Sequence, residues 1–487
     1  MTPVARMEAA CAAETGEPPR IAAMSNPAPD SWTPLPPDTD FNVVIVGAGQ
    51  AGLAAAHALR LAGIGGVLQI DASDKSAIGP WRTIARMETL RTPKEISGPE
   101  LGNPLLGYRH WHEIRYGADS FATITRILRP DWADYLDWFR DTLQLQPRYD
   151  TRLLATEPLG SRLRLTLANR GRTEHIAARK LILATGLRGA GVAHVPPHLD
   201  GLPHEFAAHT DDEIDFARLH GKTVAVLGAA SSAFDAAAVA LEQGAARVDL
   251  FCRHDDIEHA SPIRTLVYPG AVANFGALPD ADRWRTIRHL RRRAAGPMPE
   301  TVRRATAFGN FSLHVSSPWE KVRLHDGYVL ITTPHATHQA DFVIFGTGYR
   351  VDFSRRPETA GIVADLALWS DAHTPSEGLD DAALASMPYL DEGYRFTEKQ
   401  PGKAPYLRNV HCFNVGALAS TGRHLGEISS LENGIPRLVA QISQDLFLED
   451  QAYHMDRIFG EASPHLTGEE YRDSLAATAN PDIAVAS

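Results

Sequence analysis

Residues 41 to 52 read FNVVIVGAGQAG, a short apolar run followed by a glycine-rich turn. The run is rich in β-branched residues, as is typical of a strand buried in a parallel sheet. Residues 53 to 61 then have the alanine and leucine content of a helix. A strand, a glycine turn and a helix in this order predict a dinucleotide-binding βαβ unit within an α/β fold.

The three glycines of this turn have separate tasks in such a site. Gly47 makes the tight turn, Gly49 lets the backbone approach a pyrophosphate, and Gly52 allows the helix to pack closely on the strand. Gln50 and Ala51 lie between them, where the N-terminus of the helix stabilises phosphate charge. The alternative is a purely structural glycine turn.

A carboxylate at the end of the next apolar run favours the nucleotide interpretation. Residues 67 to 70 read VLQI and predict a second strand, and Asp71 follows it, 19 residues after Gly52. A carboxylate in this place can bind both hydroxyls of a ribose.

A second unit of the same kind begins with KTVAVLG at residues 222 to 228, followed by an alanine-rich helical segment. Its motif is degenerate, because alanines replace the second and third glycines and two serines fill the turn. Alanine still permits helix packing, and a serine hydroxyl can donate a hydrogen bond to phosphate. The residues predicted to form this second nucleotide site are Gly228, Ser231 and Ser232.

Arg253 ends the strand that follows, in the place that Asp71 holds in the first unit. A carboxylate there would repel a 2′-phosphate, whereas a guanidinium can bind it with two hydrogen bonds. The second unit is therefore predicted to bind NADPH in preference to NADH. The alternative is that Arg253 is a solvated surface residue.

The order of these units predicts one domain inserted into another. Apolar runs at 180–186 and 341–348 both end in Thr-Gly and bracket the second unit. Residues 435–448 predict a helix near the end of the outer domain. The predicted plan is a flexible tail over 1–40, an outer domain over 41–200 and 341–460 whose second part adjoins the substrate, an inserted NADPH-binding domain over 201–340, and a C-terminal tail over 461–487.

Composition excludes several classes of function. The chain has 487 residues and a formal net charge of −11, the wrong sign for a general nucleic-acid binder. Cys11, Cys252 and Cys412 lie too far apart for a CxxC pair, a zinc site or a disulfide framework. No stretch has the length and apolar character of a membrane span or a signal peptide. We expect a cytoplasmic protein without nucleic-acid, membrane or metal partners, and leave open whether it forms a homo-oligomer.

Together these features resemble the class B flavin monooxygenases, over residues 41 to 450. The resemblance rests on VVIVGAGQAGLAAA, Gly79-Pro-Trp81, the Ala-Thr-Gly that ends at Gly186, the second nucleotide motif and Gly346-Thr-Gly-Tyr349 followed by Asp352. This family includes flavin-containing, Baeyer–Villiger and N-hydroxylating amino-acid monooxygenases. The resemblance implies two Rossmann-like domains, with FAD in the outer domain and NADPH in the inserted one.

The resemblance also assigns individual residues. Trp81 would lie beside the flavin, with a core aromatic as the alternative. The residues expected at FAD are Gly47, Gly49, Gln50, Ala51, Gly52, Asp71, Trp81, Arg82, Gly186 and Gly416. Those expected at NADPH are Gly228, Ser231, Ser232, Arg253, Gly348 and Tyr349.

The chemistry that the resemblance implies belongs to the flavin. NADPH reduces it, O2 adds at its C4a atom, and one oxygen atom goes to a small-molecule substrate while the other leaves as water. The protein positions the nicotinamide, keeps water out and presents the substrate. The Baeyer–Villiger fingerprint is incomplete, because the stretch from Phe206 to His209 lacks its glycine and brings the histidine three residues after the phenylalanine. This departure disfavours oxygenation of ketones.

Cations are frequent between Trp81 and Trp111, a segment that in this family lies near the reacting edge of the flavin. Arg91, Lys94 or Arg109 could there capture a substrate carboxylate, and the alternative is a solvated loop face. The expected function is N-hydroxylation of a small polar or acidic amino acid, such as aspartate, or of an amine. Sulfoxidation, Baeyer–Villiger oxygenation and a non-oxygenating FAD/NADPH reductase are the alternatives.

A second basic stretch holds eight arginines between Arg283 and Arg304. Alone it resembles a nucleic-acid patch, but it lies in an acidic protein. The prediction is a solvated helix or an interface with an acidic surface.

Overall fold

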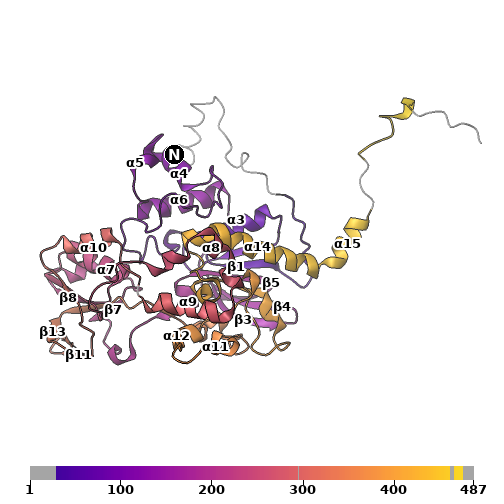
Figure 1. Ribbon diagram of the computed structural model, residues 1–487. Coiled ribbons are helices and arrows are strands. Elements are labelled where there is room, and N and C mark those ends of the chain that lie inside the picture. Colours follow the sequence, from indigo (N-terminus) through magenta and orange to yellow (C-terminus); the bar gives the residue numbers. More distant parts are fainter. Residues whose placement is uncertain (1–28, 294, 461–464, 475–487) are drawn as a thin grey trace, which may run out of the picture. The chain divides into compact units, whose positions relative to one another are not determined.

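The structure is a computed structural model that describes residues 29–293, 295–460 and 465–474 (Figure 1). The chain divides after Gln444 into two units. The second unit contains the last residues of α14 (Ile428–Glu449) and α15 (Gln451–Phe459). Among the described residues, no helix combines the length and apolar character that crossing a membrane would require.

The first sheet, built from described residues, has six strands in the order β2-β1-β5-β4-β3, with β16 also paired to β5. β1 is parallel to β2 and β5, and β16 is parallel to β5, whereas β4 is antiparallel to both β3 and β5. β16 follows the inserted residues in the chain but pairs with β5. This sheet therefore contains strands from both parts of the outer domain. The strands are β1 (Phe41–Val46), β2 (Val67–Ile70), β3 (Thr151–Leu159), β4 (Arg162–Asn169), β5 (Arg172–Gly186) and β16 (Val410–Asn414).

The inserted residues form a second sheet in the order β10-β9-β8-β14-β7, and its neighbouring strands are parallel. We predicted that this domain ends at residue 340, but β14 lies between β8 and β7, so the sheet continues to Phe345. The parallel second sheet, and the parallel pairing of β1, β2, β5 and β16 in the mixed first sheet, confirm the α/β class. The strands are β7 (Ala207–His209), β8 (Thr223–Leu227), β9 (Arg247–Phe251), β10 (Phe311–His314) and β14 (Phe342–Phe345).

Two smaller sheets complete the strands of the described chain. β11, β12 and β13 form an antiparallel sheet before β14. β6 pairs with β15, so the two connections between the domains lie side by side. The strands are β6 (Gly191–Ala193), β11 (Lys321–His325), β12 (Tyr328–Thr332), β13 (Thr337–Ala340) and β15 (Tyr349–Val351).

In each domain one helix follows the glycine turn and packs on its sheet: α3 contacts β1 and β5, and α7 contacts β8 and β9 (Figure 1). In the outer domain, aromatic side chains of α4 and α6 form a buried cluster that also includes Leu53 of α3. The remaining α-helices of the described residues are α3 (Gln50–Leu61), α4 (Tyr108–Tyr116), α5 (Ser120–Thr123), α6 (Arg129–Thr142), α7 (Ser231–Glu242), α8 (Pro269–Asn274), α9 (Asp280–Arg292), α10 (Pro299–Thr306), α11 (Trp369–Ala372), α12 (Ala382–Ala385) and α13 (Leu418–Thr421).

The predicted N-terminal tail is wrong for its described part, residues 29–40. Trp32 donates through Nε1 to the carbonyl of Ala62 at 2.7 Å, and Asp40 accepts from the backbone of Ala177 at 2.7 Å. These bonds tie the segment to the outer domain. Residues 1–28 of that tail, Cys11 among them, and residues 461–464 and 475–487 of the C-terminal tail lie outside the described residues.

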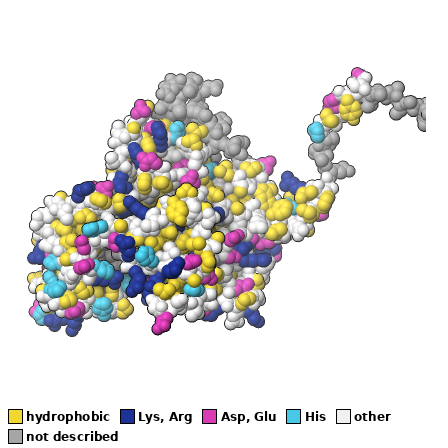
Figure 2. Space-filling model, in the orientation of Figure 1, with side chains coloured by type: hydrophobic (Ala, Val, Ile, Leu, Met, Phe, Trp, Pro, Cys, Tyr) yellow, Lys and Arg dark blue, Asp and Glu magenta, His cyan; other side chains and the backbone are white. Residues whose placement is uncertain are grey.

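The arginine-rich stretch lies at an interface within the chain. Arg283 is buried, with its guanidinium 5.0 Å from the ring centre of Trp369. Arg288 donates to the carbonyl of Gly378 at 2.7 Å, and Arg304 pairs with Glu242 at 2.5 Å. Both predicted alternatives are found in part, because these residues contact other segments of the chain while Arg285, Arg292 and Arg293 are exposed. On the face shown in Figure 2, Lys and Arg side chains are distributed among Asp and Glu side chains.

His57 makes the stability of the outer domain sensitive to acid. Its side chain is 2% exposed on α3, edge-on to Phe139 at 5.7 Å between ring centres. Burial, with a smaller contribution from the charge of Arg60, lowers the pKa of His57 from 6.5 to about 4. A buried histidine therefore resists protonation that the unfolded chain accepts.

We expect the free energy of unfolding to fall by about 3 kcal/mol as the pH drops from 6.5 to 4, since the unfolded chain binds this proton first. Above pH 6.5 the contribution is fully present. Denaturant unfolding at several pH values measures it, and His57→Leu should flatten the curve. His325→Leu, at a half-exposed side chain, should not. An unchanged slope in His57→Leu would contradict the assignment.

Candidate cofactor and active site

The glycine turn between β1 and α3 has the shape that a dinucleotide requires. Gly47 has a φ of +114°, and a Cβ added there would lie 2.4 Å from the carbonyl oxygen of Ala184. A Cβ at Gly52 would lie 1.9 Å from the carbonyl oxygen of Gly47. At Gly49, by contrast, no atom of the described chain other than those of its immediate neighbours lies within 4 Å of the Cβ position. Two glycines are thus required by the fold, and the third leaves its backbone open to a ligand.

Asp71 lies directly beside this turn. Its carboxylate accepts hydrogen bonds from the backbone N–H of Ala48 at 2.7 Å and of Ser73 at 2.8 Å. The turn and the end of β2 are therefore fixed to each other, and the binding of a ribose by Asp71 stays a prediction.

Gln50 and Ala51 open α3, and Gln50 connects it to a distant segment. Its side chain donates to the carbonyl of Gly426 at 2.7 Å and accepts from the indole N–H of Trp132 at 3.0 Å. The region just before α14 is thereby held against the first turn of α3. This contact could not be predicted from sequence, because the partners are 376 residues apart.

Gly186 and Gly416 lie at the carboxyl ends of β5 and β16, which are neighbours in the first sheet. Asn414 joins these ends, because its side chain donates to Thr185 at 3.1 Å and accepts from the backbone of Gly416 at 2.9 Å. Gly186 has a φ of +63° and open space at its Cβ position. Both glycines thus lie at the edge where α/β sheets bind ligands.

Trp81 lies close to the same turn. It lines a narrow cavity together with Ala48, Leu53 and Arg82. Arg82 forms a salt bridge with Asp137 at 2.8 Å. Trp81 is partly exposed and packs against the aromatic cluster of α4 and α6. Its contact with the flavin stays a prediction.

The second turn repeats the geometry of the first despite its degenerate sequence. Gly228 has a φ of +121°, and an added Cβ would lie 2.4 Å from the carbonyl oxygen of Gly346. Ser231 is buried at the start of α7 and accepts from the backbone of Met298 at 3.3 Å, whereas Ser232 is exposed. Gly348 has a φ of +79° and open space at its Cβ position.

Tyr349 belongs to the connection between the domains. Its hydroxyl donates to Asp211 at 2.7 Å, and Arg188 pairs with the same carboxylate at 3.1 Å. Burial, with the hydrogen bond to Asp211, raises the pKa of Tyr349. His209 lies edge-on to the tyrosine ring at 5.9 Å. The tyrosine therefore has a structural partner, and its contact with NADPH stays a prediction.

The three cations proposed to capture a carboxylate all have partners in the protein. Lys94 donates to two backbone carbonyls, those of Phe121 and Ile124, each at 2.7 Å. Arg109 pairs with Glu113 one turn along α4, at 2.9 Å. Arg91 pairs with Asp235 of the inserted domain at 2.6 Å. Local charge predicted a binding site, but Lys94 binds backbone carbonyls, Arg109 pairs with a glutamate on its own helix, and Arg91 pairs with an aspartate 144 residues away.

Comparison with known proteins places the chain in a family. A family model for pyridine nucleotide-disulphide oxidoreductases matches residues 41–267. A FAD-dependent urate hydroxylase of Xanthomonas campestris pv. campestris is 38% identical over 434 residues, which cover 88% of this chain and 91% of that protein. The chain belongs to the FAD-dependent flavoprotein monooxygenases. The predictions of an oxidoreductase of this class with FAD and NADPH as cofactors are confirmed.

Solved structures show the same fold as this monooxygenase. An ornithine N-hydroxylase of Kutzneria sp. 744 is 18% identical, covers 83% of this chain and 99% of its own, and has a TM-score of 0.67. An L-lysine 6-monooxygenase of Pseudomonas syringae has the same identity and coverage and a TM-score of 0.64. A bacillithiol disulfide reductase of Bacillus cereus is 16% identical, covers 84% of this chain and 99% of its own, and has a TM-score of 0.54.

The described cysteines of the monooxygenase do not form a dithiol pair. Cys252 and Cys412 are both free and buried, and burial raises the pKa of Cys412. A thiol in that state is a poor nucleophile. Neither residue thus suits the dithiol chemistry of a disulfide reductase.

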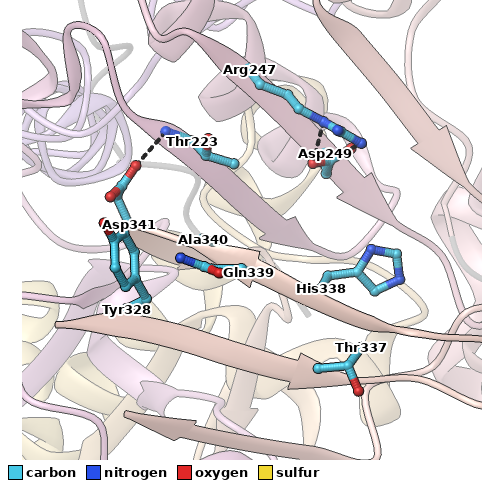
Figure 3. Close-up of a pocket in the computed structure, with 9 residues that line it drawn as sticks. All are labelled: Thr223, Arg247, Asp249, Tyr328, Thr337, His338, Gln339, Ala340 and Asp341. Carbon is cyan, nitrogen blue, oxygen red and sulfur yellow. Dashed lines mark hydrogen bonds and ion pairs between the residues drawn. The ribbon is translucent and has the colours of Figure 1, made fainter. Parts of the chain in front are cut away.

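One cavity of about 440 Å³ lies away from the cofactor edge (Figure 3). Its lining includes Thr223 and Arg247, which begin β8 and β9, and Asp341, which precedes β14. Figure 3 shows Asp341 bonded to Thr223 and Arg247 bonded to Asp249. Because α/β sheets bind nucleotides at the carboxyl ends of their strands, this cavity at the amino ends is not the cofactor site.

Proposed function

We propose that this monooxygenase hydroxylates urate or a closely related oxopurine, with NADPH as hydride donor and O2 as oxidant. The observation that carries the proposal is the 38% identity to a urate hydroxylase over nearly the whole of both chains. The solved ornithine N-hydroxylase and L-lysine 6-monooxygenase share the fold at 18% identity, which gives no indication of the substrate.

The three cations do not support the predicted capture of an acidic amino acid, because each has a partner in the protein. Capture of an amino-acid carboxylate would require a cation that is free to bind it. Lys94, Arg109 and Arg91 instead bind groups of the protein itself. N-hydroxylation of an amine stays the second candidate, and the same assay tests it.

The residues of the first turn suit the binding of FAD. The N-terminus of α3 and the open backbone at Gly49 would bind the pyrophosphate, and Asp71 the ribose. Gly186 has open space at its Cβ position and leaves the end of β5 accessible to the rest of the cofactor, whereas Gly416 is buried against Phe353. When bound, FAD supplies the chemistry that activates O2 and transfers one oxygen atom.

The residues of the second turn suit NADPH. The N-terminus of α7 would bind its pyrophosphate, with Ser231 and Ser232 beside it, and Arg253 would bind the 2′-phosphate. Gly348 and Tyr349 lie on the connection that faces both domains. The protein thus brings the two cofactors together, excludes water and orients the substrate.

The test is turnover of urate under 18O2. The balanced reaction consumes urate, NADPH, a proton and O2, and yields hydroxylated urate, NADP+ and water. We expect NADPH consumption that depends on urate and a product heavier by one oxygen atom that carries the label. Xanthine serves as the oxopurine control, and aspartate, ornithine and lysine as the amine controls. A labelled hydroxylamine from an amine, with no labelled product from urate, would overturn the proposal in favour of N-hydroxylation.

A further inference from the structure

A partly buried ion pair joins the two domains, and its carboxylate lies close to the second glycine turn. Arg91 lies in the outer domain, on the segment that follows β2. Its guanidinium donates to Asp235 on α7 of the inserted domain at 2.6 Å. Asp235 lies one turn after Ser231, where α7 leaves the second glycine turn. The position of this carboxylate is therefore rigidly linked to the predicted NADPH turn.

Asp235 depends on Arg91 because it is removed from water. Its side chain is only 4% exposed, and its other cationic neighbour, Arg304, lies 3.9 Å away. Burial raises the pKa of Asp235, against the opposing effect of the two arginines. A buried carboxylate that loses its partner is strongly destabilised, so the two side chains hold each other in place.

Other hydrogen bonds lie at the same interface between the two domains. Arg86 of the outer domain donates to the carbonyls of Thr210 and Asp212 in the inserted domain, at 2.5 and 2.7 Å. Arg304 donates in the opposite direction, to the carbonyl of Arg86 at 2.7 Å. These bonds all involve the loop between Trp81 and Arg91. This loop lies near the first glycine turn and also contacts the inserted domain.

We propose that the Arg91–Asp235 ion pair positions the inserted domain against the outer domain for reduction of the flavin by NADPH. Hydride transfer requires the reacting atoms to lie about 3 to 3.5 Å apart, and a misplacement of 1 Å costs about 100-fold in rate. Arg91 acts through Asp235 and α7, and is a positioning residue. The assignment concerns the step before oxygen reacts, and does not depend on the identity of the substrate.

The test is anaerobic reduction of the bound flavin by NADPH, without substrate, in the full-length holoenzyme. We expect Arg91→Gln and Asp235→Asn each to lower the limiting rate of reduction at least tenfold. The Kd for NADPH should change less than threefold. The double variant should be no slower than the slower single variant, because both changes remove one interaction. Arg170→Gln is the matched control, since its pair with Asp150 is exposed and lies within the outer domain.

A second measurement reports the domain contact without any turnover. We expect faster hydrogen–deuterium exchange in residues 86–94 and 207–212 of both variants, and no change in Arg170→Gln. Arg91→Lys keeps the charge but loses the planar fork, and should show an intermediate rate. This variant keeps the test decisive if an uncharged one does not fold.

Three results would each overturn the proposal. One is an unchanged limiting rate of reduction in both single variants and in Arg91→Lys. Another is a loss confined to the Kd for NADPH, which would make Arg91 a cofactor ligand. The third is a loss confined to the KM for substrate in aerobic turnover, which would make Arg91 a substrate contact. Failure of urate as substrate would leave the rate of anaerobic reduction unaffected, so the two proposals fail separately.

Discussion

Gly52→Ala should give a protein that cannot pack its first βαβ unit and contains no FAD. A Cβ at Gly52 would lie 1.9 Å from the carbonyl oxygen of Gly47 and 2.8 Å from the side-chain nitrogen of Gln69. Backbone cannot yield by that amount without moving α3 away from β1, and overpacking of this kind costs about 3 kcal/mol or more. Flavin absorbance of the purified protein and its unfolding midpoint measure the two effects.

Gly49→Ala is the matched control, because it changes the same turn without a clash. Gly49 has a φ of −73°, and nothing in the described chain other than its immediate neighbours lies within 4 Å of its Cβ position. We expect Gly49→Ala and the parent protein to have the same unfolding midpoint when flavin has been removed from both. The affinity for FAD should nevertheless fall at least tenfold, because the new methyl group occupies the approach of the pyrophosphate.

The two glycine variants thus distinguish a residue that the fold requires from one that the ligand requires. If Gly49→Ala bound FAD as tightly as the parent, the pyrophosphate would not lie over this turn. If Gly52→Ala retained both flavin and stability, the packing argument would be wrong.

The elements that local sequence encodes could be predicted. Both glycine turns, β1, β2, β8 and β9 lie where short apolar runs and glycines place them. The helix predicted at 435–448 instead begins at Ile428. Pro436 is typical of a first helical turn, but in α14 it lies inside the helix. The domain boundary predicted at residue 340 was also misplaced. Which sheet β14 joins depends on pairing with strands that are distant in the sequence, and a local pattern does not reveal this.

Side-chain partners could not be predicted, because charge in a sequence does not reveal what will neutralise it. The cations after Trp81 suggested a site for an anion. Arg91 finds its partner 144 residues away, and Lys94 finds backbone carbonyls. Conversely, Asp235 gave no signal within an alanine-rich helix. The polar contacts between the two domains form only when the inserted domain packs on the outer one, so local sequence does not indicate them.

Arg253→Ala should reduce the preference for NADPH over NADH by about 10- to 100-fold. Arg253 is exposed just after β9, at the carboxyl edge of the second sheet, and its Nε contacts His254 at 3.2 Å. A hydrogen bond to a charged group is worth about 1.5 to 3 kcal/mol, which corresponds to that range. Anaerobic flavin reduction by each donor measures the preference.

Arg247→Ala separates a specific contact from a general loss of positive charge. Arg247 begins the same strand that Arg253 follows, but it lies at the opposite edge of the sheet and pairs with Asp249 at 2.8 Å. Its loss should leave the ratio of the two donors unchanged. The effect of Arg253→Ala should also shrink at high salt, because ionic screening weakens contact with an exposed phosphate. Equal weakening of NADH and NADPH in Arg253→Ala would remove the arginine from the 2′-phosphate site, since only NADPH carries the group that it is proposed to bind.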